Sequence, residues 1–67
     1  MKKYSLTTNT KNWGGKILYQ IKAEMSFGIV LKGELGGYIE KEENLSQDSN
    51  AWVSGNAWVS GNARVSG

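Results

Sequence analysis

Few residues in this 67-residue chain could do chemistry, and their types exclude most catalytic sites. The chain has no cysteine and no histidine, which removes disulfides, thiolate chemistry and the usual zinc sites. Its serines lack a histidine or a suitably spaced lysine to activate them and are typical of turns. Glu40, Glu42 and Glu43 offer too few oxygen ligands for a calcium site. We therefore expect a protein that is not an enzyme and uses no metal or cofactor.

More distinctive side chains recur at one position of a six-residue repeat. Residues 44–67 divide into NLSQDS, NAWVSG, NAWVSG and NARVSG, of which the first copy is degenerate. Trp52, Trp58 and Arg64 share the third position, and these residue types dominate the binding energy of protein interfaces. We expect these three residues to bind another protein. The alternative is that Trp52 and Trp58 are ordinary core residues of a compact β domain.

The elements that must position these residues are expected to be β-strands. Nine glycines, no proline and many β-branched and aromatic residues favour an all-β chain. Residues 4–7 and 27–31 are predicted to be short strands, and residues 17–23 alternate most clearly. On that segment one face is formed by Ile17, Tyr19, Ile21 and Ala23.

Turns are predicted from glycines and charged residues. Residues 9–15 are expected to turn at Gly14 and Gly15, and Trp13 beside them is assigned to packing within the cap. Residues 33–40 are expected to form a passage bent by glycines that buries Leu35, Tyr38 and Ile39. Residues 40–44 are expected to be a charged loop or a single helical turn.

Charge is unevenly spread along the chain. Residues 1–32 carry a net charge of +5 and residues 33–67 a net charge of −3. No lysine cluster is dense enough to indicate nucleic-acid binding, so a nucleic-acid partner is not expected. The sequence has no apolar run of membrane-spanning length and no signal-peptide pattern. We expect a single domain, residues 1–67, that lies in the cytoplasm and does not contact a membrane.

The period of six favours a β-solenoid, in which short strands are joined at glycine corners. Gly55, Gly61 and Gly67 would form the corners, while the repeated valines and alanines would point into a narrow core. The alternative is a flexible segment rich in serine, glycine and asparagine. The fixed recurrence of valine and tryptophan favours the solenoid.

The repeat resembles that of left-handed β-helix proteins, with an aliphatic residue followed four places later by a small one. Val53 with Ala57 and Val59 with Ala63 fit this pattern. LYQIKA and KGELGGYIEKEENLSQDSNAWV resemble the start of a family of phage and prophage hexapeptide-repeat proteins with an N-terminal β cap. The resemblance implies a cap over residues 1–43 and about one solenoid coil over residues 44–67. Better-known relatives are acyltransferases with a catalytic histidine, a residue that this chain lacks.

One coil would leave an apolar cross-section and unpaired backbone groups at its far end. Ala63, Val65 and Gly67 are therefore expected to mediate self-association, giving a homo-oligomer. The alternative is that the cap folds over the coil and closes it.

The favoured function is a phage-encoded, non-enzymatic module that docks on a host protein inside the host cell. Inhibition of host defence, in the manner of anti-CRISPR proteins, would be one such role. The alternatives are a structural or assembly component of a phage, and a weak nucleic-acid binder that uses the basic N-terminal half.

Overall fold

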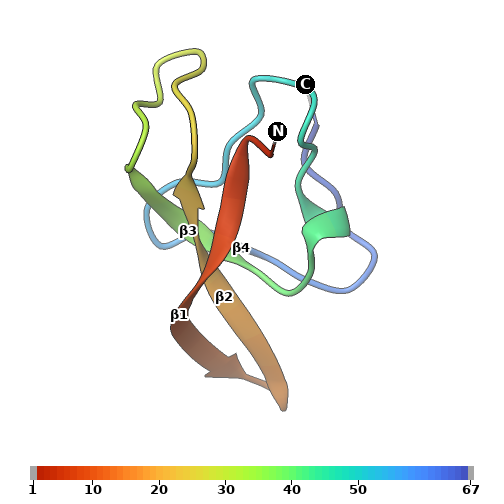
Figure 1. Ribbon diagram of the computed structural model, residues 1–67. Helices are drawn as coiled ribbons and strands as arrows, with labels where there is room; N and C mark the ends of the chain where they lie inside the picture. The colour runs from red at the N-terminus through yellow and green to blue at the C-terminus, as the bar shows by residue number, and fades with distance from the viewer. Residues whose placement is uncertain (1, 67) are drawn as a thin grey trace.

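The computed structural model describes residues 2–66, and these residues form an all-β fold, as predicted (Figure 1). A four-stranded mixed sheet has the order β1-β2-β3-β4. The first three strands are antiparallel, and β4 runs parallel to β3. No helix in the described residues is long and apolar enough to cross a membrane. The elements are β1 (Tyr4–Trp13), β2 (Lys16–Ala23), β3 (Leu35–Ile39), the 3-10 helix η1 (Glu42–Asn44) and β4 (Trp58–Val59).

The β1–β2 hairpin turns at Gly14 and Gly15, as the sequence predicted. Both glycines have positive φ, 57° and 82°, which is the requirement of a two-residue type I′ turn. Strand β1 runs on to Trp13, well beyond the short strand expected at residues 4–7. The register shifts between Leu6 and Thr10, where the polar residues in between form a β-bulge. Pairing with β2 then resumes and continues to Trp13.

Two expectations for the middle of the chain were wrong. Residues 27–31 form a tight turn rather than a strand, with paired backbone hydrogen bonds of 3.0 and 2.8 Å between Phe27 and Val30. The chain turns at Gly33, whose φ is 91°, as expected, but Leu35–Ile39 form strand β3, which passes through Gly36 and Gly37. Leu35 was expected to be buried but is 51% exposed.

The paired glycines of β3 permit close packing. A Cβ atom on Gly36 would lie 2.5 Å from the Val53 carbonyl oxygen and 2.6 Å from the Trp52 ring. One on Gly37 would clash with the Ala57 carbonyl oxygen and lie 2.6 Å from the Val53 side chain. The repeat segment therefore lies directly against the backbone of β3, which no larger residue would allow.

The repeat turns at its glycines. Gly55 and Gly61 have φ of 61° and 64°, and each lies in a turn closed by a backbone hydrogen bond of 3.2 Å. These bonds run from the N–H of Ala57 to Ser54 and from the N–H of Ala63 to Ser60. Positive φ is a conformation that glycine alone adopts readily, and it occurs at both of these predicted corners, which are thereby confirmed. The third predicted corner, Gly67, lies outside the described residues.

The repeat segment pairs in parallel with the chain that precedes it. Tyr38 pairs with Trp58, Ile39 with Val59 and, further on, Leu45 with Val65. The same offset separates all three pairs (38 to 58, 39 to 59 and 45 to 65). Only Trp58 and Val59 form a regular strand, and the sheet does not close on itself.

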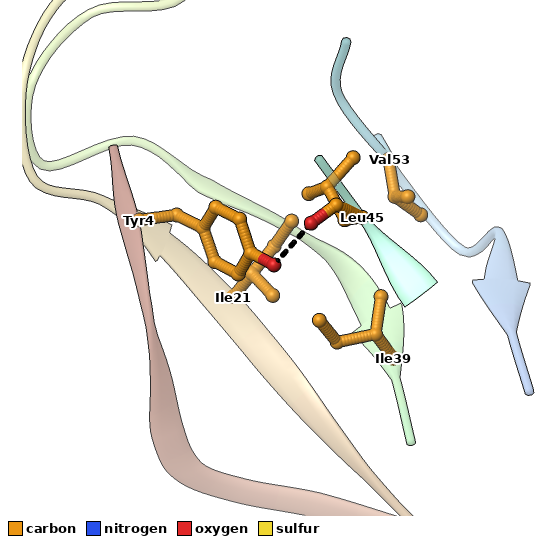
Figure 2. Close-up of a cluster of buried hydrophobic side chains, with 5 residues drawn as sticks. All are labelled: Tyr4, Ile21, Ile39, Leu45 and Val53. Atoms are coloured by element: carbon orange, nitrogen blue, oxygen red, sulfur yellow. Dashed lines mark hydrogen bonds between the residues drawn. The ribbon is translucent and has the colours of Figure 1, made fainter. Parts of the chain in front are cut away.

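One core joins the two halves of the chain. Tyr4, Ile21 and Ile39 pack against Leu45 and Val53, which come from the repeat segment (Figure 2). The Tyr4 hydroxyl donates to the Leu45 carbonyl oxygen at 2.6 Å, the bond drawn in Figure 2. The N-terminal strands are therefore packed onto the repeat through apolar contact and a buried hydrogen bond.

The repeated valines contribute to this core, but two of the repeated alanines do not. Val53 is buried, and Val59 and Val65 are half-buried against the cluster. Ala57 and Ala63 are exposed, contrary to the expectation that they point inward. Each lies at the end of a glycine turn, where its backbone N–H closes the turn and its carbonyl oxygen bonds inward.

Two buried polar side chains hold the repeat in place. Asn44 is fully buried; its amide oxygen accepts from the N–H groups of Glu40 and Lys41, at 3.1 and 2.9 Å. Its amide nitrogen donates to the carbonyl oxygens of Gly61 and Ala63, at 3.2 and 2.8 Å. One side chain thus satisfies four backbone groups from two segments that are distant in sequence.

Lys3 holds the start of the repeat. Its ammonium group donates to the carbonyl oxygens of Ser49 and Ala51, at 2.6 and 2.7 Å, and lies 4.6 Å from the centre of the Phe27 ring. Burial lowers the pKa of Lys3, while the nearby Asp48 carboxylate opposes this shift. The hydrogen bonds to carbonyl groups allow this cation to be buried.

We expect Gly37→Ala to lower the free energy of unfolding by about 2 kcal/mol or more, the cost of overpacking a tight contact. The added methyl group would force β3 away from the repeat segment. Chemical denaturation followed by tryptophan fluorescence measures the change. Thr8→Ala, at an exposed position, is the control and should change stability by only about 0.5 kcal/mol or less. Equal stability of the two variants would contradict the close approach.

We expect the stability of the protein to fall as the pH rises from about 10 towards 12. Burial, and then the carboxylates of Glu42 and Glu43, raise the pKa of Tyr4 to about 12, from an ordinary value of 10.0. The folded state therefore favours the neutral phenol, so its contribution is complete below pH 10 and is lost as pH approaches the folded pKa. Denaturant titrations across this range measure the slope. Tyr4→Phe, which cannot ionise, should show a shallower slope, and an unchanged slope would contradict this assignment.

Candidate protein-binding surface

The outer side of the sheet carries an aromatic cluster with one lysine above it. The rings of Trp13 and Trp58 lie 5.7 Å apart, tilted at 41°. The Lys11 ammonium group lies 5.4 Å from the centre of the Tyr38 ring and 5.5 Å from that of Trp58. We call these four residues the aromatic face. Trp13 and Trp58 remain 51% and 43% exposed, so the rings contact each other and are also open to solvent.

The strand register explains why these residues meet. Directly paired residues lie on the same face of a sheet, and so do residues two apart along a strand. Lys11 is paired with Leu18, and Tyr38 with Trp58, while Trp13 lies two residues after Lys11. The aromatic face is therefore built from residues of β1, β3 and β4, and the β1–β2 hairpin places Trp13 beside Trp58.

Leu18 lies on this same face and is fully buried. The alternation of residues 17–23 places it opposite Ile17, Tyr19, Ile21 and Ala23, and the strand register agrees. Burial does not follow these faces, because Leu18 is buried whereas Ile17, on the side of Ile21, is 45% exposed. Each face of the sheet buries apolar side chains, so simple alternation cannot tell which face is the core.

A carboxylate beside the aromatic face is already occupied. Glu40 accepts the backbone N–H of Gly61 at 2.7 Å and lies 3.7 Å from the Lys16 ammonium group. The hydrogen bond from Gly61 is the main reason that the pKa of Glu40 lies below its usual range, and Lys16 adds to the effect. Lys11 has no such partner: the two ion pairs within residues 2–66 are Lys2–Glu42 and Lys16–Glu40. The aromatic face therefore presents an uncompensated positive charge.

The three residues predicted to bind protein have different surroundings. Trp58 belongs to the aromatic face, whereas Trp52 packs edge-on against Phe27 at 5.4 Å and adjoins the core. The indole N–H of Trp52 is buried, and no group in the described residues accepts its hydrogen bond. Arg64 is exposed and borders a shallow hollow that it shares with Glu43 and Asn44. The structure thus brings Trp58 to an open surface, while Trp52 lies in the position of a packing residue.

The residues predicted to self-associate also differ among themselves. Ala63 is exposed, whereas Val65 is half-buried and its backbone is bonded to Asn44 and Ser46 at 2.8 and 3.0 Å. Gly67 lies outside the described residues. Val65 therefore attaches the repeat to the rest of the fold, and Ala63 remains available at the surface.

Sequence reasoning missed Lys11 and Trp13. Trp13 was assigned to packing inside the cap, yet half of it is exposed against Trp58. The glycine turn and the i, i+2 spacing were sufficient to place Lys11 and Trp13 on one face of the hairpin. What the sequence did not reveal was the parallel pairing that brings Trp58 beside them.

Comparisons with known proteins supply no family for this chain. No protein-family model matches it, and a search of curated proteins gives no match either. The described residues contain no cluster of three acidic side chains placed to hold a metal ion.

We expect Trp58→Ala and Trp52→Ala to differ sharply, although both residues occupy the same position of the repeat. Loss of Trp58 removes an exposed aromatic pair and should cost about 1 kcal/mol. Loss of Trp52 removes a ring packed on the core and should cost about 3 kcal/mol or more. Denaturant unfolding followed by circular dichroism measures both. Equal costs, or unfolding of Trp58→Ala, would contradict the placement of Trp58 on an open surface.

Proposed function

We propose that this chain is a phage-encoded, non-enzymatic module that acts inside the host cell by docking on a host protein through the aromatic face. The observation that carries the proposal is the exposed contact between Trp13 and Trp58 beneath Lys11. Aromatic residues held in place by their neighbours lose little conformational freedom on binding, which is why they dominate interface energies.

The setting of this surface supports the same reading. Trp13 lies at the end of a hairpin whose strands are paired up to the two-glycine turn, and Trp58 lies on a strand paired with β3. The two rings are therefore displayed by regular backbone rather than by a loose loop. A small protein that blocks a host enzyme or defence complex would need such a preorganised patch, and the resemblance to phage hexapeptide-repeat proteins motivates that role.

The repeat segment fits a further part of the proposal. We propose that residues 44–67 form about one coil of a β-solenoid, on which the cap over residues 1–43 is seated. Three parallel pairs with one common offset and two glycine corners of matching geometry support this reading. Such a coil would also be able to self-associate through its open end, near Ala63 and Val65. An assembly component of a phage would use that property instead of the aromatic face.

One observation favours a second candidate function. Lys11 above two aromatic rings is the combination with which single-stranded nucleic acids are stacked and neutralised. Binding of that kind would be strongly weakened by salt, whereas docking of a protein on tryptophans would be weakened much less. We favour the protein partner, because the aromatic face carries a single lysine rather than a basic groove.

The experiment that tests the proposal is capture of a partner on the immobilised protein from a nuclease-treated extract of a bacterial host. We expect a specific protein to be retained by the wild type and by Ile29→Ser, an exposed change at a position away from the aromatic face. Trp13→Ala and Trp58→Ala should each reduce retention by about thirtyfold, the effect of losing an interface hot spot.

Two controls separate the alternatives. Anisotropy with a labelled single-stranded oligonucleotide, measured at low and high salt, tests the nucleic-acid reading. Light scattering over a concentration series tests assembly. Retention that is unchanged by both tryptophan variants would contradict the proposal, and so would salt-sensitive binding of the oligonucleotide that is stronger than binding of any protein.

A further inference from the structure

The outer edge of β4 carries unpaired backbone groups. The sheet ends at this strand, and its inner side is used by β3. The N–H of Tyr38 donates to Ala57 and the N–H of Glu40 donates to Val59, both at 3.1 Å. Successive residues of a parallel strand direct their backbone groups to opposite sides. Trp58, between these two acceptors, therefore directs its N–H and C=O away from the sheet.

The same alternation recurs at Arg64. The N–H of Val65 donates to Asn44 at 2.8 Å, and its carbonyl oxygen accepts from Ser46 at 3.0 Å. The carbonyl oxygen of Ala63 also faces inward, where it accepts from the Asn44 amide. Arg64 lies between them, so its backbone groups face outward like those of Trp58. The repeat thus presents free donors and acceptors at two points, six residues apart.

The opposite edge of the sheet is less suited to pairing. Strand β1 is interrupted by the register shift between Leu6 and Thr10, and such bulges protect an edge from added strands. Within the bulge, the Thr7 hydroxyl donates to the carbonyl oxygen of Gln20 at 2.8 Å, and the Asn9 amide donates to the side-chain oxygen of Gln20 at 3.1 Å. These two hydrogen bonds hold the bulge in place. Strand β4 is therefore the edge at which a further strand would most readily add.

The charges beside this edge indicate what kind of strand would fit. Lys11 over the Trp58 ring and the exposed Arg64 take part in neither of the two ion pairs of residues 2–66. A second copy of the chain would bring no compensating charge through residues 50–66, which contain Arg64 and no carboxylate. A segment with acidic side chains would neutralise both cations.

We propose that the outer edge of β4 accepts an extended acidic segment of the partner protein as a fifth strand. Backbone hydrogen bonds to Trp58 hold the segment, and its carboxylates face Lys11 and Arg64. An apolar side chain of the segment packs on the exposed Trp58 ring. This mode of binding is β-augmentation, in which backbone pairing supplies affinity and side chains supply specificity. The inference rests on the proposed function, since it specifies how the partner is held.

The test begins with selection of displayed random peptides on the immobilised protein. We expect enrichment of peptides that combine β-branched residues with Asp or Glu. The most enriched peptide is then synthesised in three further forms: N-methylated at the odd positions, N-methylated at the even positions, and with each acidic residue replaced by its amide. Affinity is measured by fluorescence anisotropy with the full chain.

A paired edge distinguishes the two N-methylated forms, because only one set of amides faces β4. We expect one form to lose about tenfold or more in affinity while the other stays close to the parent. The amide form should bind several-fold more weakly and with less dependence on salt. On the protein side, Arg64→Glu should reproduce the loss seen with the amide peptide, and Ile29→Ser should bind normally.

Three results would overturn the inference. If both N-methylated forms bind like the parent and binding still requires Trp58, the partner contacts the aromatic face alone; the proposed function then stands and the fifth strand does not. Enrichment of peptides without acidic residues, or of none at all, also overturns it. So does light scattering that shows the free chain to be a dimer whose Trp58 amide is already protected from exchange, because a second copy then occupies the edge.

Discussion

The side-chain amide of Asn44 is the interaction on which the rest of this structure depends. It lies between the end of β3 and the last corner of the repeat, where it bonds to four backbone groups and is shielded from water. A buried donor or acceptor left unpaired costs about 1–3 kcal/mol, so loss of this amide would expose several such penalties at once. The position of the repeat relative to the sheet is thus fixed by a polar contact as much as by the core.

The N-terminal residues stabilise the same junction from the other side. Lys3 binds two carbonyl groups at the start of the repeat, and the Tyr4 hydroxyl binds Leu45. The core cluster also draws residues from both sides of position 44. The N-terminal strands and the repeat therefore stabilise each other, because each supplies side chains to one shared core. The sheet and the repeat should fold as one cooperative unit.

Local features of this fold were predictable from sequence, and the long-range ones were not. Gly14, Gly15 and the corners at Gly55 and Gly61 follow from local backbone requirements, and their positions were correctly predicted. Asn44 appeared only as the first letter of a degenerate repeat, because nothing local shows that a side chain will be buried between distant segments. For the candidate surface, Trp58 was identified from its residue type, whereas Trp13 was missed because it meets Trp58 only through the order of the strands.

The hydrogen bonds that hold the repeat against the sheet also determine which backbone groups of the repeat point outward. The groups bonded to Asn44 and β3 alternate with groups at Trp58 and Arg64 that point outward, next to the exposed tryptophan pair. The proposed binding surface and the open edge of β4 therefore both follow from the way in which the repeat pairs with β3.

Amide hydrogen exchange on the native protein, followed by NMR, tests this pattern most directly. The account predicts that the amides of Lys41 and Val65 exchange slowly and with the same free energy of opening, while those of Trp58 and Arg64 exchange fast. Fast exchange at Val65 with slow exchange at Lys41 would contradict it, because the repeat would then open independently of the sheet.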